Sequence, residues 1–380
     1  MNVALCFPGC HRRGGVERIV FECARFLSSR GHAVDVFANE WETDPIGSIT
    51  YRHVPMRKRP GFLSGKSFFA NASAMIDASK YDVLNTHGCI CPFGGVQWVQ
   101  SVHLAWIERG KKMLAGLSVA GWKRRLNPLH PVLLKLEAQH FRLRQYRQLI
   151  ATTPQVREDL QRLYGVPEKD VVIVPNGFSP TEFNPQRAAA RRVEMRRQLG
   201  LEEDHVALLF VANELERKGF RTLLAAVAAM GDRRVRIVVV GRPPAKAVMK
   251  LTSSFGLTDQ VIPCGLSSDV ASYHAACDLF VLPTQYEAFC LAILESLGSG
   301  LPVVTTNVPG ARDAIQPGVN GQLIEDPLNG EELAAALRPL LDRDRRAALA
   351  ARAAESVAAY QWPQVLLRYE TVLLQNRQCP

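Results

Sequence analysis

Residues 279–305 read LFVLPTQYEAFCLAILESLGSGLPVVT, and this stretch predicts a strand, a turn, a helix and a second strand. The apolar run Leu279–Leu282 has the length of a buried strand, and Pro283 provides a turn signal directly after it. A helix is expected over Leu291–Ser299 and a strand over Pro302–Thr305. Strands that alternate with helices are typical of a parallel sheet covered on both faces.

The same alternation extends in both directions along the chain. The expected strands are Val3–Phe7, Ala33–Ala38, Val83–Thr86, Leu149–Thr152, Val171–Pro175, Ala207–Val211, Arg236–Val240 and Gln260–Cys264, and the expected helices include Val16–Ser29 and Phe220–Met230. A chain of 380 residues exceeds one hydrophobic core, so we expect an α/β protein of two doubly wound domains.

The domain boundaries follow from this pattern. We expect a first domain over 1–177, a second over 178–358 that opens with a charged connector at 178–204, and a C-terminal helix over 359–380 that packs back on the first domain. In such folds ligands bind at the carboxyl ends of the strands, which predicts a central cleft faced by both domains.

Composition narrows the class of protein. Hydrophobic residues make up 47% and charged residues 22%, as in ordinary globular proteins. No apolar run reaches the ~18 residues of a membrane span, and residues 1–8 do not resemble a signal peptide. The nine cysteines form no CxxC pair, which favours reduced thiols. A cytoplasmic location is therefore expected.

The net charge of +10 lies entirely in the first half of the chain. Residues 1–180 hold 24 Lys and Arg against 14 Asp and Glu, whereas residues 181–380 hold 22 of each. The segment Leu104–Arg147, with Lys111, Lys112 and 123–125, and the segment Arg57–Arg59 suit an anionic membrane surface. General solubility and an ordinary amphipathic helix remain alternatives. No nucleic-acid-binding module is recognisable, so nucleic acid is not an expected partner.

Three short segments could carry chemistry. The strand at Leu279–Leu282 leads to Glu287, and then to the start of a helix whose free amides at Ala288, Phe289, Cys290 and Leu291 can receive phosphate oxygens. Glu295 lies in the same, otherwise apolar helix, where a buried carboxylate needs a partner. Arg217-Lys218-Gly219 follows a strand and can clamp a diphosphate, or form a solvated turn. Gly14-Gly15 before the first helix admits an anion or is a plain turn.

Taken together, these motifs resemble the retaining nucleotide-sugar transferases of glycosyltransferase family 4. The segments VVIVPNG at 171–177, GLPVVT at 300–305 and GVNGQL at 318–323 extend the resemblance over nearly the whole chain. The overall layout is most similar to lipopolysaccharide core glucosyltransferases and related surface-glycan enzymes. The resemblance implies the GT-B fold of two Rossmann-like domains.

The resemblance also implies a role for each residue. Arg217 and Lys218 would bind the donor diphosphate, Glu287 the hydroxyls of the donor sugar, and Glu295 the ribose. His103 resembles the family histidine near the donor sugar, but Leu104 stands where the family often has Asp, so a core or surface histidine is an equal alternative. Cys290 stands where the family usually has Gly, which puts the donor fit in question. Front-face attack is implied, with no cofactor or metal; the acidic triplet Asp342-Arg343-Asp344 is interpreted as a solvated helix face.

The sequence therefore predicts a hexosyltransferase that moves a hexose from a nucleotide-sugar, expected to be a UDP-sugar, to a lipid-linked or cell-surface polysaccharide acceptor. It would be cytoplasmic and peripheral on the inner membrane. Alternatives are a transferase of the same fold with a soluble acceptor, and a catalytically silent nucleotide-binding scaffold.

Overall fold

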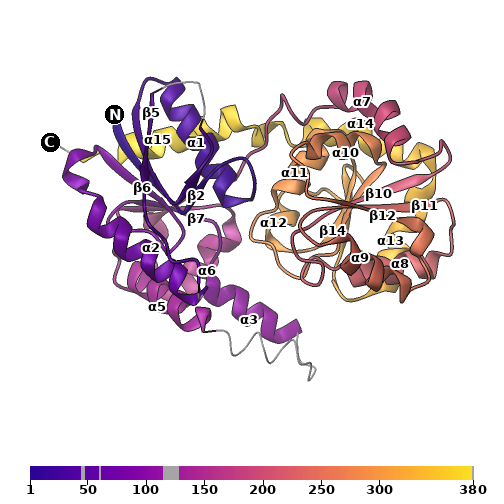
Figure 1. Cartoon of the computed structure of the whole chain (residues 1–380), viewed down its shortest axis with the longest axis horizontal. Helices are drawn as coiled ribbons and strands as arrows, with labels where there is room; N and C mark the ends of the chain where they lie inside the picture. Colours follow the sequence, from indigo (N-terminus) through magenta and orange to yellow (C-terminus); the bar gives the residue numbers. More distant parts are fainter. Residues whose placement is uncertain (44–47, 60, 114–127, 379–380) are drawn as a thin grey trace. The chain divides into compact units, whose positions relative to one another are not determined.

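The computed structural model describes residues 1–43, 48–59, 61–113 and 128–378. Contacts within the chain divide it into two compact units. Unit 1 comprises Met1–Asn176 and Pro363–Pro380, and unit 2 comprises Gly177–Trp362. Each unit is an α/β structure built on its own parallel sheet (Figure 1).

The sheet of unit 1 has seven parallel strands in the order β5-β3-β1-β6-β7-β8-β9. Their bounds are β1 Asn2–Cys6, β3 Ala33–Ala38, β5 Ile49–His53, β6 Val83–His87, β7 Val96–Val99, β8 Gln148–Ala151 and β9 Val171–Ile173. A second, two-stranded sheet pairs β2 (Gly9–Cys10) with β4 (Glu40–Trp41), just beyond the carboxyl ends of β1 and β3. This small sheet brings the loop before the first helix next to the loop after β3.

Helices cover both faces of the unit 1 sheet (Figure 1). They are α1 Val16–Ser29, α2 Phe62–Met75, α3 His103–Met113, α5 Leu129–Arg142, α6 Pro154–Tyr164 and α15 Trp362–Gln375. The C-terminal helix α15 is anchored to unit 1 by polar as well as apolar contacts. Tyr369 stacks on Trp98 and donates a 2.9 Å hydrogen bond to Asn85 of β6, and Glu370 bonds to His32. The last helix thus belongs to unit 1.

The sheet of unit 2 has six parallel strands in the order β12-β11-β10-β13-β14-β15. The strands are β10 Val206–Val211, β11 Val235–Val240, β12 Val261–Gly265, β13 Leu279–Leu282, β14 Val303–Thr306 and β15 Gly321–Ile324. The helices are α7 Pro185–Gln198, α8 Phe220–Met230, α9 Ala245–Ser253, α10 Val270–Ala276, α11 Leu291–Gly298, α12 Pro309–Arg312, α13 Gly330–Leu337 and α14 Arg343–Ser356. Nearly all residues of its strands are apolar, because helices bury both faces of the sheet.

The prediction of a connector over 178–204 is wrong for Pro185–Gln198, which forms helix α7. Asn184 caps this helix by accepting a hydrogen bond from the Arg187 amide. Arg192 and Arg196 then bond to Asp278 in unit 2. Arg192 and Arg196, which led to the prediction of a charged connector, instead hold the helix on unit 2.

Several expected elements match the observed bounds, and others were missed. Helices Val16–Ser29 and Phe220–Met230 and strands Ala33–Ala38 and Leu279–Leu282 have the expected limits, whereas strands β5, β7 and β15 were not predicted. In the part of the chain that the structure describes, no helix is long and apolar enough to cross a membrane. The side chains of Lys111 and Lys112 and the whole of residues 123–125, on which the membrane-surface hypothesis rests, lie outside the described residues.

Candidate active site

Glu287 forms the centre of a charged cluster at the carboxyl ends of β10 and β13. Its Oε1 atom accepts hydrogen bonds from Arg217 Nη1 at 2.9 Å and from Lys218 Nζ at 2.5 Å. The buried Thr284 hydroxyl lies 3.3 Å from the same oxygen. Arg217 also donates to the Tyr286 carbonyl at 3.0 Å. One carboxylate oxygen thus lies within hydrogen-bonding distance of three side chains, all from the two turns that the sequence singled out.

The electrostatics of the cluster follow from its burial. Burial alone would raise the pKa of Glu287, but Lys218 and Arg217 outweigh it and hold the pKa below its ordinary value. Burial opposes the charge of Lys218 as well, yet the Glu287 carboxylate raises the pKa of this amine. All three groups are therefore charged at neutral pH. Arg217 also forms a 3.4 Å ion pair with the exposed Glu214, so the two cations of the cluster face one largely buried and one solvent-exposed carboxylate.

Glycine allows the two turns to approach each other. Gly219 has a φ of +79°, and a Cβ atom added to it would lie 1.9 Å from the Pro283 carbonyl oxygen. Gly310 in helix α12 packs on the other side of the loop, where an added Cβ would lie 2.5 Å from the Cα of Phe289. The Gly310 amide also donates to the Glu287 carbonyl at 3.3 Å. A side chain at Gly219 would push the cations away from the carboxylate.

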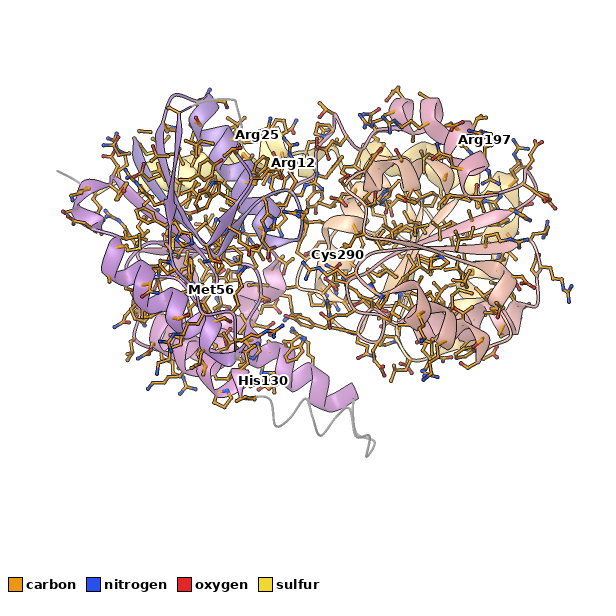
Figure 2. All side chains as sticks on the ribbon, in the orientation of Figure 1. Arg12, Arg25, Met56, His130, Arg197 and Cys290 are labelled. Carbon is orange, nitrogen blue, oxygen red and sulfur yellow. The ribbon has the colours of Figure 1, made fainter. Side chains whose placement is uncertain are left out.

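Helix α11 begins beside this cluster, and Cys290 is its N-cap residue. The Cys290 side chain accepts no hydrogen bond from the first amides of the helix, which include that of Leu291. Ala288, Cys290 and Glu295 are buried, while Phe289 and Leu291 are partly exposed. Burial raises the pKa of the Cys290 thiol to about 11. Lys218 lowers this pKa, whereas Glu287 and Glu295 raise it. The predicted residues 287–295 and the two cations are thus neighbours; Figure 2 labels Cys290 among them.

His103, in unit 1, is the first residue of α3. The carboxylate of Glu137 accepts hydrogen bonds from the backbone amides of His103 and Leu104, which satisfies the start of the helix. The His103 ring stacks on Trp106, and its Nε2 lies 3.0 Å from His130 Nδ1. Burial and the neighbouring His130 lower the pKa of His103 to about 4. The ring is therefore neutral at physiological pH, and a catalytic role for it stays a prediction.

Gly14 and Gly15 precede α1 in unit 1. Gly14 has a φ of +120°, and an added Cβ would lie 2.4 Å from Glu17 Oε2. Gly15 is the N-cap of α1, makes no side-chain cap, and has open space where a Cβ would point. The helix start is therefore open at Gly15, whereas the Glu17 carboxylate lies against Gly14. A role for both glycines in donor binding stays a prediction.

One possible metal-binding group was missed by the sequence analysis. Among the described residues, Glu202, Asp204 and His205 lie close together, just before the amino end of β10. Both ring nitrogens of His205 are engaged, by the Glu202 amide at 3.0 Å and by Arg236 at 2.8 Å. The Arg217 turn follows the opposite end of β10, so this group is not part of the charged cluster. Asp342 of the acidic triplet is exposed and caps α14, in agreement with its interpretation as a solvated helix face.

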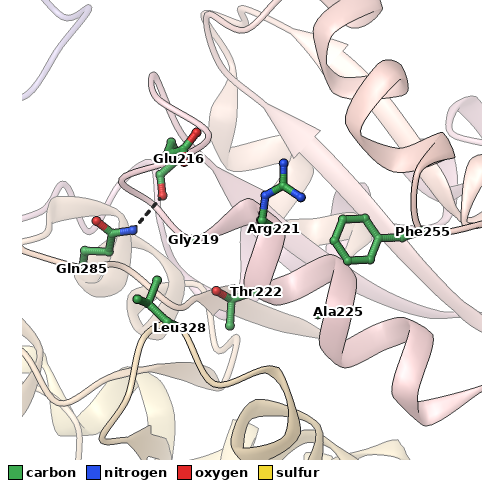
Figure 3. Close-up of a pocket in the computed structure, with 8 residues that line it drawn as sticks. All are labelled: Glu216, Gly219, Arg221, Thr222, Ala225, Phe255, Gln285 and Leu328. Atoms are coloured by element: carbon green, nitrogen blue, oxygen red, sulfur yellow. Dashed lines mark hydrogen bonds between the residues drawn. The ribbon is translucent and has the colours of Figure 1, made fainter. Parts of the chain in front are cut away.

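A cavity of about 390 Å³ lies beside the first turns of helix α8 (Figure 3). Its lining residues are Glu216, Gly219, Arg221, Thr222, Ala225, Phe255, Gln285 and Leu328. Gln285 Nε2 donates to the Glu216 carbonyl at 3.4 Å across its rim. The cavity shares the turn with the cluster, but Arg217, Lys218 and Glu287 do not line it. The charged cluster therefore lies outside the lining of this cavity.

Two partners of the cluster were missed from sequence. Thr284 lies near Glu287 Oε1, and Glu214 forms a 3.4 Å ion pair with Arg217. A hydroxyl at the end of a buried strand and an acid three residues before an arginine were the available signals. Neither is specific, because many turns contain such residues.

Comparison with known proteins identifies the family. Residues 13–182 match the family described as Glycosyltransferase Family 4, and residues 191–356 match the one described as Glycosyl transferases group 1. A relative from Streptosporangium roseum, named D-inositol 3-phosphate glycosyltransferase, is 30% identical, with 96% of this chain and 89% of the relative covered. The chain belongs to glycosyltransferase family 4. The sequence predicted a hexosyltransferase of this family. The family match and the named relatives confirm that prediction.

Solved structures confirm the GT-B fold of this family 4 glycosyltransferase. WaaG, a glycosyltransferase involved in lipopolysaccharide biosynthesis, aligns with a TM-score of 0.82 at 22% identity, with 98% of this chain and 99% of WaaG covered. HepE of Anabaena in complex with UDP-glucose aligns with a TM-score of 0.75 at 17% identity, with 99% and 100% covered. At these identities the similarity shows the fold alone.

Proposed function

We propose that this glycosyltransferase transfers a hexose from a UDP-sugar with retention of anomeric configuration and without a metal. The main support is the ion-paired cluster in which Arg217 and Lys218 both bond to the Glu287 carboxylate. A nucleotide-sugar presents a diphosphate next to a ring of hydroxyls, and the cluster offers cations beside a carboxylate. HepE, a protein of the same fold, was solved with UDP-glucose, which supports the choice of donor.

Each group in the cluster has a task in this proposal. Oε1 of Glu287 is occupied by its protein donors, and no bond to Oε2 is recorded among the described residues. Oε2 would accept hydrogen bonds from the sugar hydroxyls, while the N–H groups of Arg217 and Lys218 that do not bond to Glu287 would face the diphosphate oxygens. Cations already held in place stabilise the charge that develops on a leaving group at little cost in reorganisation. They would thereby take the part that a divalent cation plays in other transferases.

The reaction that we propose is a front-face substitution. The C1–O bond to the diphosphate breaks, and its electron pair moves to the diphosphate oxygen. The acceptor hydroxyl forms a new C1–O bond on the same face and releases its proton to the departing phosphate. Arg217, Lys218 and the first amides of α11 stabilise the phosphate as it gains charge. Glu295 would bind the ribose hydroxyls.

The acceptor that we propose is a lipid-linked or cell-surface glycan, reached by a peripheral enzyme on the cytoplasmic face of the inner membrane. The similarity of fold to WaaG, which takes part in lipopolysaccharide biosynthesis, supports this choice. A soluble phosphorylated polyol is the second candidate, favoured by relatives named for D-inositol 3-phosphate. The silent-scaffold alternative is disfavoured, because a scaffold has no need for a buried carboxylate shared by two cations.

Calorimetric titration with UDP, GDP and ADP in EDTA tests the donor site, with the Arg217→Ala and Glu295→Ala variants alongside. We expect the wild-type protein to bind UDP without metal and both variants to bind it more weakly. If a folded protein binds none of the three nucleotides, the proposal is wrong. NMR of the product formed from a UDP-α-sugar tests retention, and a β-linked product would exclude it.

A further inference from the structure

His103 lies at the edge of unit 1 where a parallel sheet binds ligands. It begins helix α3 a few residues after β7 ends at Val99, and β7 lies inside the seven-stranded sheet. The carboxyl ends of such strands form the ligand-binding edge of the fold. The His103 side chain is partly exposed. What it can do for a ligand therefore depends on how the ring is held.

Three contacts hold His103, one for each part of the residue. Its backbone amide and that of Leu104 donate to the carboxylate of Glu137 in α5. The imidazole ring stacks on Trp106 of the same helix, with centroids 5.4 Å apart and planes at 16°. The Nε2 atom lies 3.0 Å from Nδ1 of His130, also in α5 (Figure 2). The ring is thus held along its face and at one of its two nitrogen atoms.

The contact with Glu137 costs stability. Glu137 is 2% exposed, and burial raises the pKa of its carboxyl group against the hydrogen bonds that it accepts. Tyr164 of α6 donates one of these bonds at 2.7 Å. Further along α3, Arg109 pairs at 2.9 Å with Asp159, a second buried acid of α6. A serine or threonine could cap the helix without burying a carboxyl group. Polar groups buried at a cost are typical of elements whose position matters for function.

The contact with His130 determines which nitrogen of His103 carries the proton. Burial, with a contribution from His130, lowers the pKa of His103 to about 4, so its ring is neutral at physiological pH. One nitrogen of a neutral ring donates and the other accepts. If His103 donates from Nε2 to a neutral His130, both rings carry the proton on Nε2, the preferred tautomer of histidine in water. The reverse bond requires the less favoured tautomer in both rings.

We propose that His130 is a positioning residue, which holds His103 in the tautomer whose Nδ1 accepts a hydrogen bond from a substrate hydroxyl group. Among the described residues, no hydrogen bond to this Nδ1 is recorded. Sugar donors and glycan or polyol acceptors all present hydroxyl groups. The inference rests on the proposed function, because the hydroxyl belongs to a substrate of that reaction. His130 itself does not touch the substrate and acts through His103.

Two variants separate the hydrogen bond from the packing of the rings. His130→Phe keeps an aromatic ring beside His103 and Trp106 but removes Nδ1. His130→Asn keeps a hydrogen-bond acceptor close to the position of Nδ1. The matched control is His53→Phe, at an exposed histidine of β5 in the same unit. Each variant is made alone and together with His103→Gln, and the hydrolysis of UDP-glucose and the affinity for UDP are measured.

We expect His130→Phe to lower kcat about tenfold, the effect of one lost hydrogen bond, with UDP affinity unchanged. His130→Asn should recover most of the rate, and His53→Phe should leave it unchanged. In the His103→Gln background His130→Phe should have no further effect, because His130 acts through His103. Wild-type activity in His130→Phe, or an equal loss with and without His103→Gln, would overturn the inference.

Nitrogen-15 NMR of protein labelled in its histidine rings reads the tautomer without requiring activity. The His103 signals are assigned by their absence in His103→Gln. We expect wild-type His103 to carry its proton on Nε2, His130→Phe to shift it toward a mixture of both tautomers, and His130→Asn to retain the wild-type signals. A proton on Nδ1 in the wild type, or unchanged signals in His130→Phe, would overturn the inference. Failure of the wild type to bind UDP would instead contradict the proposed function.

Discussion

The two units of this glycosyltransferase present charge in opposite ways. In unit 2, the side chains of Arg217 and Lys218 are largely buried and share the largely buried carboxylate of Glu287. In unit 1, Arg13 and Arg57 stand exposed, and no ion pair to a described residue is recorded for either. Buried charges must be paired because water no longer solvates them, whereas exposed charges can await a ligand. The Glu287 cluster is therefore held in place by its own ion pairs, whereas the side chains of Arg13 and Arg57 can change conformation at little cost.

The largest effect is expected for Glu287→Gln, which removes the charge that holds both cations. We expect kcat for sugar transfer, or for hydrolysis of the UDP-sugar, to fall by about 10²- to 10³-fold. Steady-state kinetics measure it. Glu214→Gln is the matched control, since Glu214 also pairs with Arg217 but has an exposed side chain. Similar losses in both variants would contradict a special role for Glu287.

Gly219→Ala should destabilise unit 2, since the new methyl group would collide with the Pro283 carbonyl at a positive φ. We expect a loss of about 3 kcal/mol or more, seen as a fall in Tm of roughly 6–12 °C. Gly231→Ala, at the other end of α8, has a φ of +66° but open space around the added Cβ. Its cost should be about 1–2 kcal/mol. Equal shifts in Tm would show that the close approach of the two turns is not required.

Acid should weaken unit 1 before unit 2. Burial lowers the pKa of His87 to about 3 and that of His140 to about 4, and burial with a contribution from His130 lowers the pKa of His103 to about 4. In unit 2, burial lowers the pKa of His274 to about 4. The unfolded chain binds protons near the ordinary pKa of 6.5, so the stability from neutral histidines is full above that pH and is lost as pH falls toward 4. The pKa of Glu287 is lowered, so the stability that its ionised carboxylate contributes is lost only as the pH falls below the ordinary carboxyl pKa of 4.5.

Hydrogen exchange followed by mass spectrometry, corrected for intrinsic rates, measures this difference between pH 7 and pH 5. Peptides from β6, β7 and α5 should lose protection at pH 5 before peptides from β10 and β13. Earlier loss in unit 2 would contradict the prediction.

Cys290→Ser should have the smallest effect. The thiol has a pKa of about 11 and is neutral at physiological pH, so serine leaves the charge of the donor site unchanged. We expect UDP affinity within about threefold of wild type, a difference of under 1 kcal/mol. Cys290→Asp would add a negative charge beside the expected diphosphate and should weaken binding strongly. If serine also abolishes binding in calorimetry, Cys290 shapes the site through its size or its sulfur.

The sequence by itself determined the alternating α/β pattern and most residues of the charged cluster. Arg217, Lys218 and Glu287 each lie within a few residues of a strand end, and parallel strands bring their carboxyl ends to one edge, so local motifs were sufficient. Strand β7, with Gln97 inside it, and the short β15 were missed, because only the surrounding sheet makes such segments strands.

Only the tertiary structure decided which charges are paired and which are open. The arginines of α7 and those that follow β2 and β5 look alike in the sequence. Arg192 and Arg196 nevertheless bond to Asp278, whereas no ion pair to a described residue is recorded for Arg13, Arg57 and Arg59. The pairing of Glu40 with Lys58, eighteen residues away, depends in the same way on the order of strands β3 and β5. Ion pairs between distant segments depend on how the strands and helices pack. A short sequence motif does not contain that information, because it does not specify which distant segments become neighbours.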